Sequence, residues 1–455
     1  MIMFFSRRSV FKSILSLISY LSLLKGSLGN NQNLAGKKVI VVGAGISGLA
    51  AASTLAQQGA NVVILEAKNY IGGRIKTDRS LGASFEYGAG WIHGPSKENP
   101  IRNLADHSSS SLFVTDDDSA ELINLSGDDI DEDIWDEIDE IWQEIMHKDI
   151  DSDTEGSILD AINAYDPNIW RDPNIRWVFS AYTEFDYGGP VQEISAGLIN
   201  QMRGFSTADV IFENGYDKII NVIANNLQIQ TNTIVKSVNY STNKNITVST
   251  LSKNYECDYL ICAVPLGVLK SNSIKFNPIL PKYLLDSIER VGFGTVTKLA
   301  LKFKDQFWDS DIQYYYTVTK ETGRWPVWLN YRTFSKVKIL MGLCMGDYAR
   351  KADSMSKKEL TEDGLEVLKN VWEDNVGEVE QVLRTSWLND PFTKGAYSFP
   401  KVNNSEEDFK NLAEPLDNKL FFCGEHTNLK YLATTHGALF SGIRAAKEVI
   451  KASEK

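Results

Sequence analysis

Residues 39–74 constrain the fold of this chain more than any other stretch. The apolar, β-branched residues 39–42 are followed by the glycine-rich turn 43–48, a helix of small residues, and a second apolar strand that ends at Glu66. A G-x-G-x-x-G turn between a strand and a helix is typical of the βαβ unit that binds dinucleotides. We therefore predict an α/β domain in which the N-terminus of the first helix faces the phosphates of a dinucleotide.

Each glycine of this turn has its own physical role. Gly43 permits the tight turn, Gly45 lets a pyrophosphate approach the backbone, and Gly48 lets the helix pack closely on the strand. Ser47 lies inside the same turn. Glu66 follows Gly48 by 18 residues and is placed to accept hydrogen bonds from a ribose. These five residues are the first candidates for a cofactor site.

The turn belongs to a longer pattern that ends in Gly72, Gly73 and Arg74. A nicotinamide-binding unit does not need this glycine doublet. The 32 residues from 43 to 74 resemble, without a gap, the FAD signature of the flavin-containing amine oxidase superfamily. The resemblance implies FAD as the cofactor, with Glu66 on the adenosine ribose and Arg74 on the diphosphate. Gly73 is a further candidate contact.

A second motif near the C-terminus also resembles this family. Residues 421–427 and 433–438 match its second FAD motif, and the following helix is expected to direct its N-terminus at the flavin pyrimidine ring. Gly90 and Trp91 match a pair that lies against the flavin. The other residues that the resemblance assigns to FAD are Val235, Trp387, Glu425, Thr434 and Thr435.

Three further residues are candidates for catalysis. Residues 88–94, Gly-Ala-Gly-Trp-Ile-His-Gly, closely resemble a polyamine oxidase segment whose histidine, here His93, faces the substrate amine. Strand alternation puts Lys298 on the same face as Val296. A lysine on a strand usually faces solvent, but in amine oxidases the lysine at this position hydrogen-bonds through water to flavin N5. Tyr397 matches one wall of the aromatic cage that aligns the amine.

Two positions depart from the pattern of monoamine oxidases. The residue before the cage tyrosine is a cysteine bonded to the flavin in that group, but here it is Ala396, so we expect non-covalent FAD. The second cage wall is usually aromatic, but here it corresponds to Thr434, as in lysine-specific histone demethylases. This departure disfavours small monoamines as substrates.

The whole chain has 455 residues and a formal net charge of −12. This length predicts two or three domains with ample core. The negative charge argues against nucleic acid as a partner and favours a cationic substrate. Only four cysteines occur, and three lie in or beside apolar, strand-like runs. We therefore predict core thiols, without a disulfide framework and without a metal site.

Residues 116–155 are unusually acidic, with 18 carboxylates. Apolar residues recur at helical spacing within 134–145. The simpler interpretation is an amphipathic helix with a solvated acidic face. The alternative is a surface that guides a polycation towards the active site. Further along the chain, residues 191–204 are predicted to be helical.

Residues 1–29 have the layout of a signal peptide. A basic segment with Arg7 and Arg8 precedes the apolar run 14–24 and a stretch of small residues. The paired arginines resemble the twin-arginine signal of bacteria, which exports folded proteins and would suit a chain that loads FAD before export. We expect an exported protein, periplasmic or secreted, without stable membrane insertion of the mature chain. A eukaryotic secretory signal and a retained membrane anchor are the alternatives.

The resemblance covers nearly all of residues 37–450 and implies an α/β fold. We expect a glutathione-reductase-type FAD-binding Rossmann domain plus a substrate-binding domain with a mixed β-sheet and helices. Because the two FAD motifs stand at opposite ends of the chain, both domains should be discontinuous. The expected FAD-binding segments are 36–95, 212–290 and 395–455, and the expected substrate-binding segments are 96–211 and 291–394.

The resemblance implies oxidation of a carbon–nitrogen bond of a polyamine or related amine to an imine, with O2 reduced to H2O2. An L-amino-acid oxidase is one alternative, but Ile92 and His93 stand where that group has an arginine for the substrate carboxylate. A monoamine oxidase, a histone demethylase and a non-catalytic FAD-binding protein are the others. Lys298 and Tyr397 favour an enzyme over the last of these.

Overall fold

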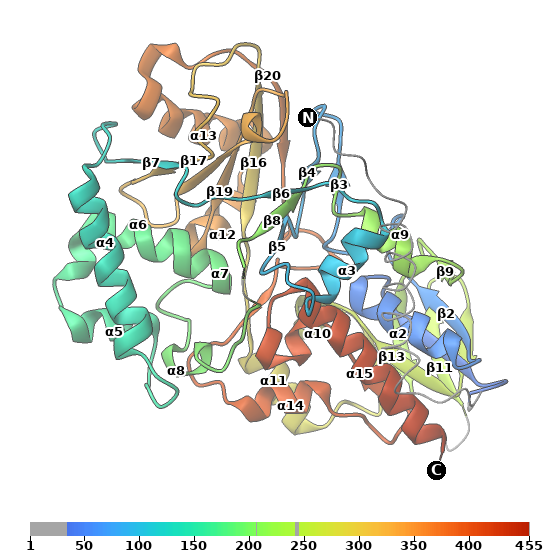
Figure 1. Ribbon diagram of the computed structural model, residues 1–455. Coiled ribbons are helices and arrows are strands. Elements are labelled where there is room, and N and C mark those ends of the chain that lie inside the picture. The colour runs from blue at the N-terminus through green and yellow to red at the C-terminus, as the bar shows by residue number, and fades with distance from the viewer. Residues whose placement is uncertain (1–33, 206, 242–244, 455) are drawn as a thin grey trace.

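The computed structural model describes residues 34–205, 207–241 and 245–454, so the predicted signal peptide lies outside the described residues. Two sheets, each with its own helices, make up the two halves of the molecule (Figure 1). A five-stranded parallel sheet lies at the lower right of that view, and a six-stranded sheet lies at the top. The fold is therefore α/β with a Rossmann-like half, as predicted.

The parallel sheet contains the predicted βαβ unit. Its strands, in spatial order, are β22 (Leu420–Phe422), β13 (Tyr259–Cys262), β1 (Lys38–Val42), β2 (Asn61–Leu65) and β9 (Gln228–Gln230). Val39 and Val41 of β1 pack into one hydrophobic cluster, and Ile40 and Val42 pack into another on the opposite face. A parallel sheet is covered on both faces, which explains the unbroken apolar sequence of β1.

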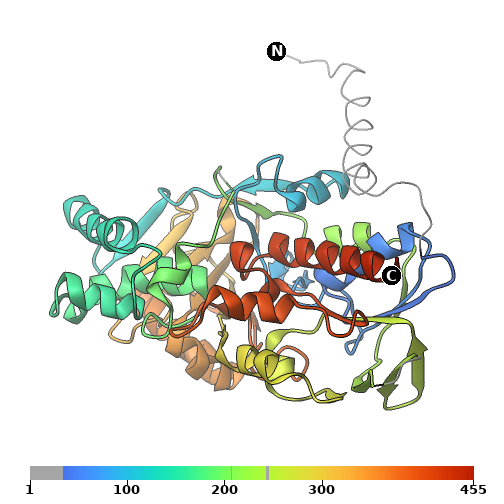
Figure 2. The same cartoon turned by 90° about the horizontal axis from the view of Figure 1, so that it is seen from below.

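Two helices from opposite ends of the chain cover one face of this sheet. Helices α2 (Ile46–Gln57) and α15 (Thr435–Ser453) lie side by side (Figure 2). Glycine permits this close packing, because a Cβ atom on Gly442 would lie 2.1 Å from the backbone oxygen of Ser47. Likewise a Cβ on Gly48 would lie 2.1 Å from the oxygen of Gly43. This packing brings the glycine turn and the start of α15 together.

The six-stranded sheet forms the centre of the other half. Its strands, in spatial order, are β20 (Val379–Arg384), β16 (Thr297–Phe303), β19 (Ile339–Cys344), β18 (Val327–Asn330), β17 (Tyr314–Thr317) and β7 (Ala120–Ile123). Along β16, Leu299 and Leu301 enter one core cluster, whereas Val296 and Ala300 enter another. The predicted alternation is confirmed, and both faces of β16 are buried.

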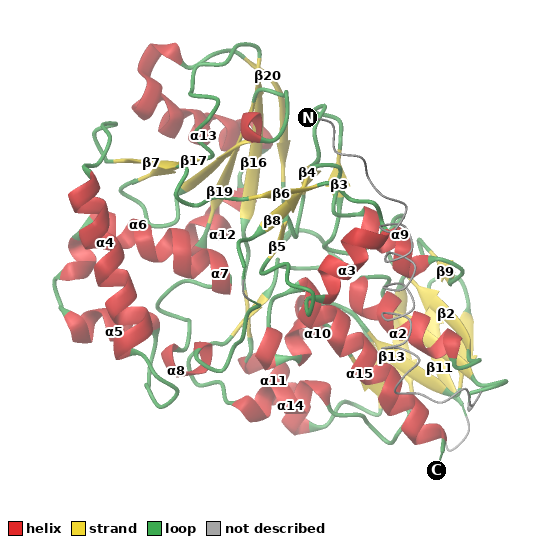
Figure 3. Ribbon diagram, viewed as in Figure 1, coloured by secondary structure: helices red, strands yellow, loops and turns green. Residues whose placement is uncertain are grey.

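Helices cover both faces of this sheet (Figure 3). On one face are α12 (Gly346–Ser354) and α13 (Lys357–Trp372). On the other are α4 (Glu132–Glu144), α5 (Ile158–Tyr165), α6 (Pro173–Val178) and the π-helix η3 (Phe179–Glu184), which leads into the short α7 (Phe185–Tyr187). Lys298 on β16 is thus held on an element that is buried on both sides.

The remaining strands form four smaller sheets among the described residues. The remaining strands are β3 (Thr77–Asp78), β4 (Phe85–Glu86), β5 (Trp91–Ile92), β6 (Leu112–Val114), β8 (Val210–Phe212), β10 (Val235–Asn239), β11 (Ile246–Thr250), β12 (Asn254–Cys257), β14 (Lys275–Asn277), β15 (Gly292–Phe293) and β21 (Ser398–Phe399). The other helices are α3 (Pro100–His107), α9 (Lys218–Ala224), α10 (Leu266–Lys270), α11 (Lys282–Arg290) and α14 (Glu406–Ala413). Strand β8 spans the expected segment boundary between residues 211 and 212.

The acidic segment forms the predicted amphipathic helix. In α4, Ile138 is buried, while the acidic residues of the helix are mostly exposed. The helix continues as the π-helix η1 (Ile145–Asp149), which buries Ile145.

The predicted helix over 191–204 is wrong. Only α8 (Ala196–Ile199) forms there. Ile194 pairs with Lys401 in a β-bridge, and the Ser195 side chain caps the helix start, so the preceding residues cannot be helical. Backbone pairing with a distant segment has overridden the local helical pattern.

Two further expectations concern the whole chain. All four cysteines are free and buried, so the prediction of core thiols is confirmed. Within the described ranges, no helix is long and apolar enough to span a membrane.

Candidate active site

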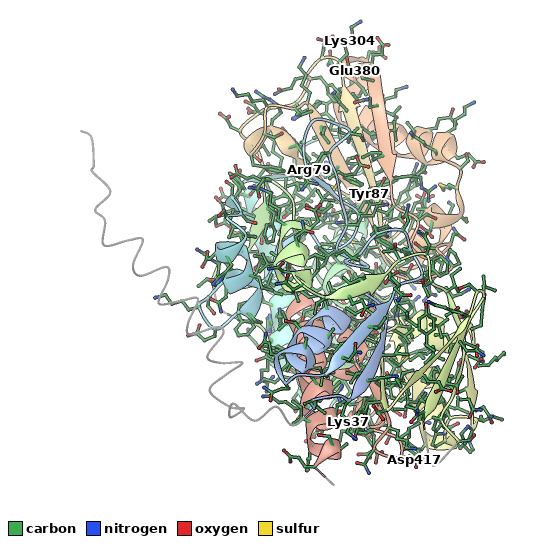
Figure 4. The ribbon with its side chains drawn as sticks, turned by 90° about the vertical axis from the view of Figure 1, so that its right-hand side faces the viewer. Lys37, Arg79, Tyr87, Lys304, Glu380 and Asp417 are labelled. Carbon is green, nitrogen blue, oxygen red and sulfur yellow. The ribbon has the colours of Figure 1, made fainter. Side chains whose placement is uncertain are left out.

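One cavity of about 670 Å³ lies between the two halves. Tyr87, which lines it, lies near the middle of the molecule in Figure 4, between Lys304 and Glu380 at one end and Lys37 and Asp417 at the other. The predicted site residues that line the cavity are Gly43, Gly45, Ser47, Glu66, Gly73, Arg74, Gly90, Trp91, His93, Val235, Lys298, Trp387, Tyr397, Glu425, Thr434 and Thr435. Gly48 does not line it and serves the packing of α2.

The glycine turn forms a cradle at one side of the cavity. Gly43 has φ +108°, a conformation that favours glycine, and a Cβ there would lie 3.0 Å from the oxygen of Ala263. A Cβ on Gly45, by contrast, would meet no atom within 4 Å, because that residue faces open space. The backbone at Gly45 can therefore be approached by a ligand, at the N-terminus of α2.

Glu66 holds this turn in place. Its Oε2 accepts the backbone N–H of Ala44 at 2.7 Å, and its Oε1 accepts the N–H of Lys68 at 2.8 Å. Burial raises the pKa of the carboxyl group, and these two hydrogen bonds oppose the rise. A carboxylate has about four acceptor positions, so the two oxygens retain capacity for ribose hydroxyls.

Arg74 and Glu425, from the two predicted FAD motifs, form an ion pair at the cavity. The Nη1 of Arg74 lies 2.9 Å from Oε1 of Glu425 and also donates to the backbone oxygen of Ala396 at 2.8 Å. Glu425 in turn accepts the backbone N–H groups of Ser398 and Ala433. Motifs that are 351 residues apart in sequence are thereby fixed against each other.

The start of α15 is organised by two threonines. Thr434 is the N-cap: its hydroxyl accepts the N–H of Gly437 at 2.9 Å and donates to the oxygen of Tyr431 at 2.8 Å. The hydroxyl of Thr435 lies 2.8 Å from that of Tyr216. Both threonine hydroxyls therefore have protein partners that hold the helix N-terminus at the cavity.

These features fit FAD. The open backbone at Gly45, the acceptor Glu66 and the cation Arg74 all line a single cavity that also includes Trp91, as an extended dinucleotide requires. Val235 lines the same cavity, two residues after Thr233, whose backbone N–H donates to the backbone oxygen of Glu66 at 2.8 Å. Trp387 is fixed by a hydrogen bond from Nε1 to the oxygen of Tyr87 at 2.8 Å.

Lys298 lies at the other end of the cavity and is 5% exposed. Its Nζ donates to the backbone oxygens of Glu86 at 3.1 Å and Gly88 at 2.7 Å, and it lies 5.6 Å from the centre of the Trp91 ring. Burial lowers the pKa of Lys298 to about 8, although the charge of Glu86 opposes the shift. Lys298 is therefore not a solvent-facing residue of the strand, because its ammonium is buried and lines the cavity.

Tyr397 lines the same region of the cavity. Its hydroxyl donates to the backbone oxygen of Phe185, and its ring packs on Gly188, where a Cβ would lie only 2.3 Å from the ring. Burial, with the nearby charge of Asp186, raises the pKa of Tyr397, so the phenol stays neutral. The ring is fixed as a wall.

His93 is paired with a carboxylate. Its Nδ1 lies 2.5 Å from Oδ2 of Asp209, and the other oxygen of Asp209 accepts the N–H of Gly94 at 2.9 Å. The His93 side chain is 51% exposed. Desolvation by the surrounding protein lowers the pKa of His93, but the hydrogen bond and charge of Asp209 outweigh it and raise the pKa overall. The imidazole therefore tends towards its charged form.

Sequence reasoning missed two carboxylates. Asp186 lines the cavity as an exposed residue. Desolvation by the surrounding protein, with the charges of Asp209 and Asp117, raises its pKa to about 6, while His93 opposes the rise. Glu86 is buried behind Lys298, and burial raises its pKa to about 7. Asp186 begins the sequence Asp-Tyr-Gly-Gly-Pro, which is typical of a turn and carries no catalytic pattern. Glu86 stands two residues before the Gly88–Gly94 motif, and only its acidity within an apolar strand could have indicated a role.

Comparisons with known proteins agree with this geometry. A family model described as flavin containing amine oxidoreductase matches residues 115–450, and one described as an NAD(P)-binding Rossmann-like domain matches residues 41–108. The chain is 30% identical to probable polyamine oxidase 4 of Arabidopsis thaliana over 444 residues, which are 92% of this chain and 88% of that protein.

Two other relatives from the same plant are much longer than the match. The chain is 30% identical to Protein FLOWERING LOCUS D over 442 residues, 91% of this chain and 56% of that protein. It is 29% identical to lysine-specific histone demethylase 1 homolog 3 over 489 residues, 91% of this chain and 30% of that protein. The chain thus spans about half or less of these two relatives.

Proposed function

This chain belongs to the family of flavin-containing amine oxidoreductases with FAD as cofactor, and we propose that it oxidises a carbon–nitrogen bond of a polyamine or a related amine. In the proposed reaction, the carbon next to nitrogen loses a hydride equivalent and the amine becomes an imine. Water then hydrolyses the imine to a carbonyl compound and a free amine. Dioxygen takes up the two electrons and two protons and leaves as H2O2.

The protein's residues would bind, orient and shield the reacting amine. Bound FAD supplies the two-electron chemistry. Tyr397, held by Phe185, forms a rigid wall that orients the amine, and Lys298 offers a buried hydrogen-bond donor at the same end of the cavity. His93, held by Asp209, contacts the substrate. The nitrogen that reacts must be unprotonated, so a second charged nitrogen would need an anion of its own.

The observation that carries this proposal is Asp186. Asp186 lines the cavity together with Tyr397 and His93, and its negative charge acts on both groups. A carboxylate in the same cavity as Tyr397 and Lys298 favours a substrate with a second ammonium over a simple monoamine. The charge of Asp117 acts on the same group from the acidic segment.

The test is peroxide release from polyamines and from alkyl monoamines of matched length. We expect the polyamine to have the higher kcat/KM, and Asp186→Asn to lower it about tenfold for the polyamine, or about 1.4 kcal/mol, with little change for the monoamine. Asp305→Asn is the matched control, since that side chain is 82% exposed on the surface. Equal turnover of both amines by the wild type would contradict the polyamine assignment.

A second substrate class has a specific observation in its favour. One of the relatives is named as a lysine-specific histone demethylase. In this chain Thr434 replaces the aromatic cage wall, which leaves room for a bulkier amine. A dimethyl-lysine peptide therefore belongs in the same assay. Faster peroxide release from the peptide than from any polyamine would make this chain a demethylase.

We propose that the FAD is bound without a covalent link, because Ala396 offers no thiol at the attachment position. Acid precipitation of the yellow protein should leave the colour in the supernatant. Flavin that stays in the pellet would contradict the proposal.

We also propose that residues 1–29 direct export, on the twin-arginine-like pattern of Arg7 and Arg8. Changing both arginines to lysine should trap the precursor in the bacterial cytoplasm. Continued export of the double variant in a host with only the twin-arginine route would contradict it.

A further inference from the structure

Glu86 places a carboxylate in the interior directly behind the cavity. The residue ends β4 and is 6% exposed. Its Oε1 accepts the backbone N–H of Tyr216 at 2.9 Å, and its Oε2 accepts the hydroxyl of Thr77 at 2.7 Å. Both donors are neutral, so neither cancels the charge of the carboxylate. A buried carboxylate of this kind requires a nearby cation or must take up a proton.

Lys298 is that cation. A Cβ built on Gly90 would lie 3.6 Å from Nζ of Lys298 and 3.8 Å from Cβ of Glu86, so the two side chains flank the same glycine. The lysine also donates to the backbone oxygens of Glu86 and Gly88, on either side of Tyr87. An ammonium has three hydrogens, and these two bonds leave one for the cavity that Lys298 lines.

Each of the two groups offsets the effect of burial on the other. Burial raises the pKa of Glu86 to about 7 and lowers that of Lys298 to about 8, and in each case the partner's charge opposes the shift. Among the described residues, Asp217 also acts on Glu86, and the charge of Glu86 reaches Arg79. Two phenols, those of Tyr216 and Tyr331, also feel the charge of Glu86. Lys298 has Glu86 as its charged neighbour.

We propose that Glu86 is a positioning residue of the active site, whose buried carboxylate keeps Lys298 in its ammonium form and holds it against the Glu86–Gly88 backbone. The lysine is thereby kept as a hydrogen-bond donor towards the cavity. The role of this donor towards a substrate rests on the function proposed above. The pairing of Glu86 with Lys298 does not depend on that function.

Glu86 also connects Lys298, through Tyr216, to the start of α15. Tyr216 donates its N–H to Glu86, and its hydroxyl lies 2.8 Å from that of Thr435 at the start of α15. This link gives a matched control. Tyr216→Phe removes the contact with Thr435 but keeps the N–H that donates to Glu86, so it perturbs the packing without changing the charge pair.

The test is a pH titration of the visible absorption band of the oxidised, FAD-loaded enzyme, from about pH 6 to 10. A change in charge next to the bound flavin alters this band. Glu86→Gln is the main variant, because an amide of the same shape can accept from Tyr216 and donate to the Thr77 hydroxyl. Removing the negative charge lowers the affinity of Lys298 for its proton. The midpoint in Glu86→Gln should therefore fall by about one pH unit or more, a tenfold change.

Two further variants separate a positioning role from a purely structural one. In Lys298→Met the transition of the lysine near pH 8 should be absent. Any step that remains belongs to the Glu86 carboxyl, whose pKa is about 7, and should vanish when Glu86→Gln is added. Tyr216→Phe should keep the wild-type midpoint. If Glu86→Gln does not retain FAD, Glu86→Asp provides the comparison, because it keeps the charge and should stay within about half a pH unit of the wild type.

Three outcomes would overturn the proposal. They are identical titration curves for the wild type and Glu86→Gln, a transition near pH 8 that persists in Lys298→Met, and a Glu86→Asp midpoint displaced as far as a loss of charge would give. The titration needs no amine. If no amine is oxidised but the midpoints move as expected, the proposed function fails and the charge pair stands.

Discussion

The two ends of the cavity are built in different ways. At the cofactor end, Gly43, Gly45 and Glu66 lie within one βαβ unit, and most of their contacts are to backbone atoms. At the catalytic end, Lys298, Tyr397 and His93 come from three segments, and each is fixed by a partner far away in sequence, such as Asp209, 116 residues from His93. The glycine turn and Glu66 are thus held by local contacts, whereas the Arg74–Glu425 ion pair and the three candidate catalytic residues depend on long-range packing.

Within the glycine turn, the same substitution should have very different effects at Gly48 and at Gly45. Gly48→Ala should prevent correct folding, because the new Cβ would lie 2.1 Å from a backbone oxygen that cannot move away. A cost of about 4 kcal/mol or more is expected. Gly45→Ala, where a Cβ meets open space, should fold normally but bind FAD more weakly. Thermal unfolding of both apoproteins, followed by FAD titration, distinguishes them, and equal stability would contradict the packing described.

At the catalytic end, Lys298→Met should leave FAD bound but slow the chemistry. Methionine keeps most of the apolar stem and removes the donors. We expect a loss of 10- to 1000-fold, or about 1.4–4 kcal/mol, in flavin reduction, in reoxidation, or in both. Stopped-flow measurement of each half-reaction checks this. Wild-type rates in both half-reactions would show that Lys298 has only a structural role.

The cofactor end should respond in the opposite way. Glu66→Ala removes the acceptor for ribose and for the N–H of Ala44, so FAD should bind about 1.5–3 kcal/mol more weakly. The reduction rate of fully loaded enzyme should be nearly unchanged. Fluorescence titration of apoprotein gives the dissociation constant. An unchanged constant would be incompatible with the position of Glu66.

The smallest expected effect is a pH dependence at the substrate end. The pKa of Asp186, raised to about 6, means that its carboxylate is charged above that pH and neutral below it. The ratio of KM for a polyamine to KM for a matched monoamine should therefore rise as pH falls from about 7 to 5, by a few-fold. In Asp186→Asn the ratio should not change with pH. A wild-type ratio that is constant would rule out this carboxylate as the second anchor.

The same contrast explains what the sequence could predict. The glycine turn, Glu66 and the alternation along β16 follow local rules, so residue types and spacing predicted them. Lys298, Tyr397 and His93 could be singled out only through the family resemblance, because a lone lysine, tyrosine or histidine has no distinguishing spacing. Asp186 and Glu86 were missed, since their importance arises from neighbours such as Lys298, 212 residues from Glu86.

Local patterns also misled where a distant partner intervened. Residues 191–204 have a helical pattern, yet the bridge of Ile194 to Lys401 limits the helix to Ala196–Ile199. Thr434 lines the cavity, as a cage-wall position requires, and its hydroxyl also caps α15. The second role is visible only once the start of the helix is known.

Oxidation of an amine in the cavity lined by Lys298, Tyr397 and Asp186 can be measured directly. The measurement mixes the oxidised, FAD-loaded enzyme with a polyamine in the absence of oxygen and follows the visible flavin band. We expect the band to bleach, air to restore it with release of H2O2, and a matched monoamine to bleach it more slowly. A flavin that stays oxidised with every polyamine, monoamine and methyl-lysine peptide would contradict the proposed oxidation.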